Sequence, residues 1–501
     1  MRSMPDALAM TPAVPAPAAA PGRRGMALYG LFGFAAGLPF YMFSTVLALR
    51  LQAHGVALAV IGFFAWVQLL PTLKFVWAPL LDRYNVPGFG RFWGKRPGWI
   101  MLSQLGIFSA MLAMAATAGD GSLAVTALFA VLLAFWTTTL EVAADAWRIE
   151  LYPTQDEQGP IVAANLWGYR TAMVAAGSGA LLVADTAGWT AAYLLIAVAA
   201  FLPFPVLAGM RAQGEGGGRG VALATGVGAS TVIIGIGAAL TALIGWIVLG
   251  LAQRAGIGAD SNVTPYVLVL CMLPFLAMAA ALPKIRRAAP DSPLRRSTVL
   301  GPYVDFFWRY GFAALILMAF VSIYRMGDVL ALNLSKPMIK GLGYSLTQIG
   351  RADSLVALLA SMIGVGLGGW LATRWRMTWL LALGAVVAAL GNFGFVWLAH
   401  QRVDEALLYV ATAGDQFGNG FAGAVFVVYL SLLVNPRYPG AQYAFLTGFA
   451  FLLPRLLAGA GGTMVNVIGY DGFFLLSGVL SLAAILFLPA LARIVAREPD
   501  A

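Results

Sequence analysis

The sequence predicts an all-α polytopic membrane protein, and three observations support this class. Of its 501 residues, 60% are hydrophobic and 10% are charged, whereas a soluble domain carries about 25% charged residues. The apolar residues fall in long runs, where a membrane β-barrel would show short alternating strands. The basic residues lie in short loops between those runs, so the net charge of +10 reports topology and not nucleic-acid binding.

Apolar runs long enough to cross a bilayer divide the chain into spans. A helix of about 20 apolar residues reaches across the roughly 30 Å of a hydrocarbon core. We expect fourteen such helices, at about 26–50, 59–80, 98–118, 122–146, 160–184, 189–209, 221–252, 264–283, 309–332, 346–372, 378–399, 405–433, 440–465 and 472–492.

The connecting segments group these helices as six, two and six. Residues 1–25 are rich in Ala and Pro and lack the apolar core of a signal peptide, so we expect a disordered cytoplasmic tail. A Gly-rich linker and a basic linker separate the groups. The predicted organisation is an N-terminal six-helix bundle (26–212), a linker with two additional helices (213–283), a basic linker (284–308), a C-terminal six-helix bundle (309–493) and a tail (494–501).

Basic residues separate the loops into two sides of the membrane. One side carries most of them, and the other carries little beyond Arg50, Arg254, Lys336, Lys340 and Arg402. Loops rich in Lys and Arg stay in the cytoplasm. An even number of helices returns the chain to its starting side, so both termini are predicted to be cytoplasmic.

Charged residues inside the spans are unevenly distributed. Six-plus-six helices with a central basic linker suggest the major facilitator arrangement, in which two pseudo-repeated bundles rock around a midplane site. The third, sixth, ninth and twelfth core helices of that arrangement face lipid, and here they contain no Asp, Glu, Lys or Arg; neither do the two additional spans. A charge at membrane depth costs about 2.5–3.5 kcal/mol, so charges confined to cavity-lining helices indicate a transporter.

The segment 135–153 carries the densest group of such charges. Glu141, Asp145 and Arg148 are spaced i, i+4 and i+7, and on a helix they form one stripe. The stripe suits a proton or substrate relay. The alternative is a charge cluster that anchors the helix end.

Other buried charges also have two interpretations. Arg325 and Asp328 are either site residues or a simple i, i+3 ion pair. Asp415, in the sequence DQFGNG, suits a broken helix that exposes backbone to a ligand, or else marks a packing kink. Arg170 and Arg455 either grip a carboxylate of the cargo or pair with acidic residues of the chain.

The loop between the second and third spans combines an Asp-Arg pair with a basic cluster. Asp82 and Arg83 precede Arg91, Lys95 and Arg96, which is the pattern of the cytoplasmic gating loop of major facilitators. Such a charge network latches one conformation and releases it in another. Plain positive-inside anchoring is the alternative.

Five short motifs are spread along the chain: LKFVWAPLLDRY, ADAWRIELYP, GYR at 168–170, Gly327-Asp328 and QYAFL at 442–446. Together they resemble the AmpG muropeptide permease family, over about residues 28–490. The resemblance implies a fourteen-helix major facilitator in the bacterial inner membrane. Its implied activity is proton-coupled import of N-acetylglucosaminyl-anhydro-N-acetylmuramyl peptides, by alternating access, for cell-wall recycling. Glu141 stands where the family tends to have Asp, and Asp415 stands where it has Glu. Arg325 replaces Lys, and Trp147 replaces Tyr. The signs of the charges are kept, while the exact cargo stays open.

From these residues we expect three sets of functional side chains. A coupling carboxylate needs a pKa between the pH values of the two compartments. Removal of the carboxylate from water can raise its pKa into that range. Basic residues and tryptophans suit the carboxylates and sugar faces of an anionic glycopeptide. The predicted sets are proton-coupling residues (Glu141, Asp145, Asp328, Asp415), substrate-binding residues (Arg50, Lys74, Trp147, Arg148, Asn165, Tyr169, Arg170, Arg325, Gln416, Asn419, Arg455) and gating residues (Asp82, Arg83, Arg91, Lys95, Arg96).

Rival functions differ in cargo or in class. The same fold could carry a siderophore or an acyl-CoA-like anion. A membrane-embedded enzyme would need a nucleophile, metal or activated-sugar motif, and the chain has one cysteine, two histidines and no DxD-type acidic pair. A receptor would not explain charges confined to cavity helices. We therefore expect a non-enzymatic monomer without metal or cofactor, whose partners are the cargo, protons and the lipid bilayer.

Overall fold

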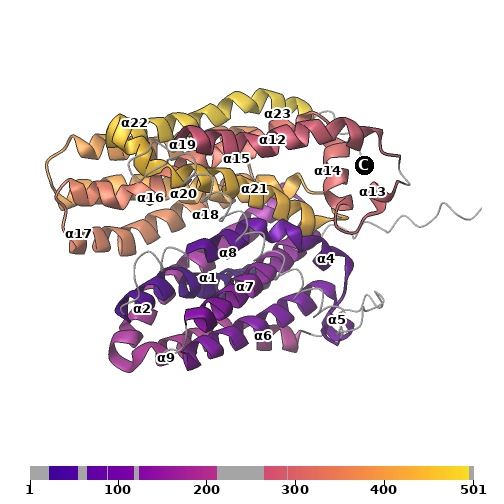
Figure 1. The fold of residues 1–501 in the computed structure, drawn as a ribbon, viewed down its shortest axis with the longest axis horizontal. Helices are drawn as coiled ribbons and strands as arrows, with labels where there is room; N and C mark the ends of the chain where they lie inside the picture. Colours follow the sequence, from indigo (N-terminus) through magenta and orange to yellow (C-terminus); the bar gives the residue numbers. More distant parts are fainter. Residues whose placement is uncertain are drawn as a thin grey trace, which may run out of the picture.

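The computed structural model describes residues 22–54, 65–86, 88–117, 123–210, 264–289 and 292–495. Most of these residues are helical, with no strand among them (Figure 1), which confirms the all-α class. Ten helical stretches of the described chain are long and apolar enough to cross a membrane. The predictions for 1–21, the Gly-rich linker, the span 221–252 and 496–501 lie outside the described residues, and the predicted domain boundaries stay predictions.

The first group of helices, coloured indigo to magenta in Figure 1, is called the N-half (residues 22–210). A single glycine with positive φ, Gly188 (φ 84°), turns the chain between the fifth and sixth spans within α9. The elements are α1 (Arg23–Tyr41), η1 (Met42–Val46), α2 (Leu47–Ala53), η2 (Ala65–Val76), α4 (Ala78–Arg83), α5 (Phe89–Trp93), α6 (Lys95–Ala116), α7 (Leu123–Leu151), α8 (Gln155–Val174), η3 (Ala175–Gly179), α9 (Ala180–Ala200) and α10 (Pro203–Gly209).

The second group, rose through orange to yellow in Figure 1, is called the C-half (residues 292–495). Gly469 (φ 71°) makes the corresponding turn between its last two spans, within α22. The elements are α13 (Pro293–Arg296), α14 (Gly301–Tyr310), α15 (Ala313–Tyr324), α16 (Met326–Gly341), α17 (Leu346–Arg351), η4 (Ala352–Val356), α18 (Ala357–Ala372), α19 (Met377–Ala399), α20 (Glu405–Leu432), α21 (Pro439–Gly459), α22 (Gly461–Ala483), η5 (Ala484–Phe487) and α23 (Leu488–Val495).

One additional helix precedes the C-half. This is α12 (Thr264–Arg287), which packs against α14, α15, α21 and α22 and leaves most of its apolar side chains exposed. The helix thus lies on the outside of the C-half. Its position fits a helix that faces lipid and carries no part of a central site.

Of the two interpretations of the sequence DQFGNG in the tenth core helix, the broken helix is wrong. α20 runs unbroken through Asp415 and the glycines that follow it. Those glycines let neighbouring helices approach instead: a Cβ at Gly420 would lie 2.3 Å from the carbonyl oxygen of Ser361 on α18. A break in helical conformation occurs instead in the seventh core helix. It lies at Arg325 (φ −100°, ψ −2°), which separates α15 from α16.

Glycines also hold the N-half together. α1 and α8 pack closely, and a Cβ at Gly33 would lie 1.9 Å from the carbonyl oxygen of Asn165. At Gly168 a Cβ would lie 1.9 Å from the carbonyl oxygen of Gly30. Because these contacts are backbone to backbone, the small residues set the separation of the two helices.

The two halves meet near one end of the molecule. We call this the basic end: it is the end at which α4, α13 and α14 lie (Figure 1). The inter-half contacts involve α4, η2, α7 and α8 of the N-half with α18, α20 and α21 of the C-half. The site described below lies along this contact.

Candidate functional site

Lys74, Glu141 and Arg455 form a charged group between η2, α7 and α21. The Nζ atom of Lys74 lies 3.8 Å from Oε2 of Glu141, and both belong to the N-half. Arg455 reaches the group from the C-half and interacts electrostatically with Glu141 and with Tyr169 of α8. We call Lys74, Glu141, Tyr169 and Arg455 the Glu141 cluster. It places two cations and one carboxylate at the boundary between the halves.

A second group surrounds the break at Arg325. Its guanidinium Nη1 donates to Oδ2 of Asp328 at 2.7 Å, and both side chains are buried. This contact agrees with the ion-pair interpretation of the i, i+3 spacing. Asp415 on α20 interacts electrostatically with Asp328, and its Oδ2 accepts a hydrogen bond from Nε2 of Gln416 at 2.9 Å.

Arg170 joins this second group from the N-half. Its Nη2 atom donates to Oδ1 of Asn419 on α20 at 2.8 Å, across the boundary between the halves. Arg170 also lies within electrostatic range of Arg325 and Asp415. We call Arg170, Arg325, Asp328, Asp415 and Asn419 the Asp328 cluster, and Tyr169, next to Arg170 in the chain, connects it to the Glu141 cluster.

Arg148 is enclosed between the halves rather than exposed to a cavity. Only 1% of its surface is accessible. Its guanidinium donates to Oδ1 of Asp145 at 2.9 Å, to Oγ of Ser431 in the C-half at 3.0 Å, and to Gln158. It also lies 5.4 Å from the ring centroid of Tyr443. In this conformation Arg148 therefore fastens α7 to α8 and to the C-half.

Asp82 links the predicted gating loop to the C-half at the basic end. Its carboxylate accepts from the backbone N–H groups of Gly440 (3.0 Å) and Ala441 (2.7 Å), at the first turn of α21. Arg96 donates to the same carboxylate at 2.8 Å and to Glu150 at 2.7 Å. A carboxylate at a helix N-terminus is stabilised by the free amides and the helix dipole.

The remaining gating candidates are placed less centrally. Lys95 donates from Nζ to the carbonyl oxygen of Asp82 at 2.9 Å, and Arg83 is exposed. The side chain of Arg91 lies outside the described residues. Lys95 therefore supports the loop that holds Asp82.

Three predicted substrate residues lie inside the N-half. Arg50 is buried and donates to the carbonyl oxygens of Met114 and Thr117, so it caps the end of α6. Trp147 packs 6.0 Å from the ring of Phe32. The side chain of Asn165 donates to the carbonyl oxygen of Tyr29 on α1 at 3.1 Å. The structure thus brings these residues to helix contacts and not to the two charged clusters.

Several residues of the network have no counterpart among the predicted sets. They are Glu150, Gln158, Ser431 and Tyr443. Glu150 had a signal, since it is an acidic residue at the helix end next to the basic loop. The other three are uncharged, and only the tertiary structure shows their contacts with Arg148.

Comparison with known proteins finds relatives along nearly the whole chain, although no protein-family model matches it. The protein named transporter AmpG 4 of Rickettsia conorii is 27% identical over 460 residues, which is 91% of this chain and 94% of that protein. The anhydromuropeptide permease of Escherichia coli (strain K12) is 25% identical over 463 residues, 91% of this chain and 78% of that protein.

Solved structures agree on the fold. The human organic anion transporter MFSD10 matches with a TM-score of 0.52 and 15% identity, over 93% of this chain and 97% of that one. A peptide transporter, POT, matches with a TM-score of 0.52 and 16% identity, over 94% and 93% of the two chains. By sequence the chain is a relative of AmpG-type permeases, and by structure it is a polytopic membrane protein with the major facilitator fold.

Proposed function

We propose that the chain imports anhydro-muropeptides into the bacterial cytoplasm together with protons, by alternating access. The observation that carries this proposal is the pair of charged clusters at the boundary between the two halves of a chain related to an anhydromuropeptide permease. Both halves contribute charged side chains there, so one bound molecule can contact both. The membrane is then the bacterial inner membrane, with the basic end in the cytoplasm.

The cations of the two clusters suit the carboxylates of a peptide cargo. Arg170 now donates to the neutral amide oxygen of Asn419. A cargo carboxylate is a stronger acceptor than an amide oxygen, because its negative charge adds an attraction between opposite charges to the hydrogen bond from the guanidinium. Cargo can therefore displace Asn419 from Arg170. This exchange would free the contact between α8 and α20.

Asp415 is our candidate for the proton carrier. Glu141, Asp145 and Asp328 each have a basic partner, Lys74, Arg148 and Arg325 respectively. Among the described residues, no ion pair within 4.0 Å includes Asp415, whose carboxylate accepts from Gln416. Protonating a paired carboxylate abandons its partner in the membrane interior, which costs several kcal/mol. Protonation of Asp415 leaves no ion-pair partner behind in the described chain, so this cost does not arise.

We infer that the described conformation is the outward-facing state. The cross-half hydrogen bonds named above extend from Asp82 at the basic end no further than Arg170 in α8. With the basic end in the cytoplasm, these contacts close the cytoplasmic side. Release of the cargo then requires that they open.

Uptake of labelled anhydro-muropeptide, with and without a protonophore, tests the proposal. The chain is expressed in cells that lack their own permease, and its presence in the membrane is measured. We expect uptake that the protonophore abolishes and that unlabelled anhydro-muropeptide inhibits. Inhibition by a ferric siderophore or an acyl-CoA, with none by anhydro-muropeptide, would reject this cargo.

The Asp415→Asn variant tests the coupling role separately. We expect it to lose accumulation while it retains exchange of labelled for unlabelled cargo, and we expect Asp415→Glu to keep both. The control is Asp156→Asn, an exposed acid at the basic end. Loss of exchange as well as accumulation would make Asp415 a cargo ligand instead.

A further inference from the structure

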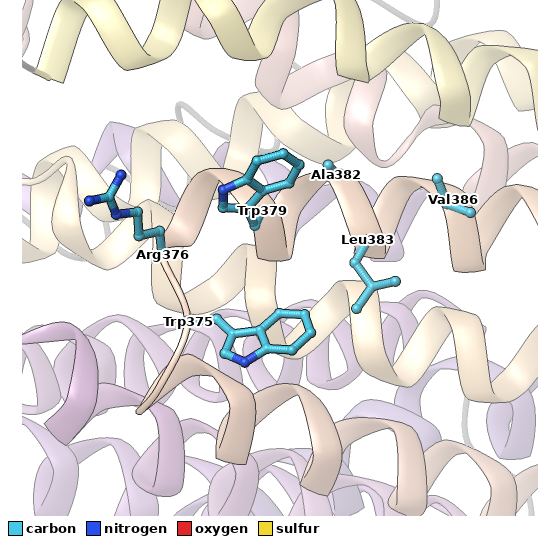
Figure 2. A pocket seen from close by; sticks show the side chains of 6 residues that line it. All are labelled: Trp375, Arg376, Trp379, Ala382, Leu383 and Val386. Carbon is cyan, nitrogen blue, oxygen red and sulfur yellow. The ribbon is translucent and has the colours of Figure 1, made fainter.

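A shallow groove lies on the outer surface of α19, next to the basic end. It encloses about 500 Å³ and is open to the surroundings of the protein (Figure 2). α19 packs with its other faces on α16, α20 and α22, so the groove lies on the surface that the sequence predicts to face lipid. The lining residues are Trp375, Arg376, Trp379, Ala382, Leu383 and Val386.

Two tryptophans border this groove at its end nearest the connection between α18 and α19. Trp379 is 70% exposed and Trp375 is 49% exposed. Figure 2 shows their indoles beside the start of α19, with Leu383 and Val386 further along the helix. Exposed indoles of a membrane protein lie at the boundary between lipid headgroups and acyl chains. The groove therefore begins at that boundary and continues into the hydrocarbon region.

The length of the groove fits a single acyl chain of one leaflet. From Arg376 to Val386 the helix advances ten residues, which at 1.5 Å per residue is about 15 Å. One leaflet contributes about half of the roughly 30 Å hydrocarbon core. The remaining lining is apolar, as an acyl chain requires.

The mouth of the groove is positively charged. Arg374 and Arg376 are both exposed, and the guanidinium of Arg374 lies 4.1 Å from the ring centroid of Trp370. In the described part of the chain, no acidic residue lies within ion-pair distance of either arginine. A guanidinium in this position matches a lipid phosphate, and anionic lipids are attracted to basic segments on the cytoplasmic side.

We propose that this groove binds one anionic glycerophospholipid. The acyl chain lies along Ala382, Leu383 and Val386, and the phosphate pairs with Arg376. The two indoles hold the glycerol region between them. This site is separate from the charged clusters, and the proposal holds whichever cargo the chain carries.

Purified full-length protein in detergent tests this site with added phosphatidylglycerol or phosphatidylcholine. Thermal unfolding and native mass spectrometry measure stabilisation and the number of lipids retained. We expect wild-type protein to retain one phosphatidylglycerol with at least tenfold preference over phosphatidylcholine. Arg376→Gln should lose that preference, Arg376→Lys should keep most of it, and Trp379→Ala should weaken retention of both lipids.

Matched controls lie at the opposite end of the same helix. Trp397 is an exposed tryptophan near the end of α19, and Arg402 is an exposed arginine just beyond it. We expect Trp397→Ala and Arg402→Gln to behave as wild type. Equal retention of the two lipids by wild-type protein would overturn the proposal. So would equal losses in Arg376→Gln and Arg402→Gln, or a dimer that Trp379→Ala dissolves, which would assign the groove to a second copy of the chain.

Discussion

Replacing Asp82 by Asn should shift the protein away from the conformation closed at the basic end. The carboxylate of Asp82 accepts from the backbone amides of Gly440 and Ala441, which belong to the other half. Its partner Arg96, and Glu150 next to it, belong to the same half as Asp82. A rocking motion therefore keeps the pair with Arg96 and breaks only the two amide contacts.

The size of the shift follows from those two contacts. An Asn side chain has one oxygen to accept from one amide, and it turns an NH₂ group toward the other. One charge-assisted hydrogen bond is lost, which costs about 1.5–3 kcal/mol, and the remaining one loses its charge. A shift of about 2 kcal/mol changes the ratio of closed to open molecules roughly 30-fold.

Distances between spin labels at the basic end measure this ratio. Cysteines replace the exposed Arg83 and Arg437 in a Cys271→Ser background, which removes the single native cysteine. We expect Asp82→Asn to add a population with a longer distance, and Asp156→Asn, at an exposed acid of the same end, to leave the distribution unchanged. If Asp82→Asn keeps the wild-type distribution, the amide contacts do not hold the two halves together.

Two further predictions concern stability. Gly33→Ala places a methyl group 1.9 Å from the carbonyl oxygen of Asn165, so it should push α1 away from α8 and lower the melting temperature by several degrees. The control is Gly177→Ala, because nothing lies within 4 Å of a Cβ at that position. Equal melting temperatures of the two variants would contradict the packing argument. Arg148→Met leaves the carboxylate of Asp145 without its partner; because 24% of the Asp145 side chain is exposed, the loss should be about 1–3 kcal/mol. Arg148→Lys should lose less, and adding Asp145→Asn to Arg148→Met should recover part of the loss in a thermal melt.

Most of the described helices were predictable, because an apolar run of about 20 residues is long enough to cross a bilayer as a helix. The pair Arg325–Asp328 was predictable for a similar reason, since an i, i+3 spacing brings two side chains together on any helix. The glycines after Asp415 were misread: a glycine that bends a helix and one that admits a neighbouring helix look alike in sequence. Only the approach of Ser361 to Gly420 separates the two uses.

The partners of the central residues were not predictable. Arg170 and Asn419 are separated by 249 positions and meet only because α8 and α20 lie side by side across the boundary. By sequence, Arg50 belonged among the few basic residues of the second side of the membrane and in the predicted substrate-binding set. Its role as a cap of α6 depends on where that helix ends relative to α2, which hydropathy does not specify.

The placement of charges suits a protein whose halves must separate. The central ion pairs described above each lie within one half: Lys74–Glu141 and Asp145–Arg148 in the N-half, Arg325–Asp328 in the C-half. Three charged groups make hydrogen bonds to uncharged groups across the boundary: Arg170 to Asn419, Arg148 to Ser431 and Asp82 to backbone amides.

This division lowers the cost of motion. Breaking a buried ion pair costs about 3–5 kcal/mol because it leaves an uncompensated charge, whereas a hydrogen bond between a charged and a neutral group contributes about 1.5–3 kcal/mol. The proposed rocking motion keeps those three pairs and exchanges the hydrogen bonds of Arg170, Arg148 and Asp82 across the boundary for contacts with water or cargo. It also separates Arg455 from Glu141, which keeps Lys74 as its partner. An ion pair that crosses the boundary should therefore slow transport while it raises thermal stability. Asn419→Asp would create such a pair, because it gives Arg170 of the N-half a carboxylate partner in the C-half.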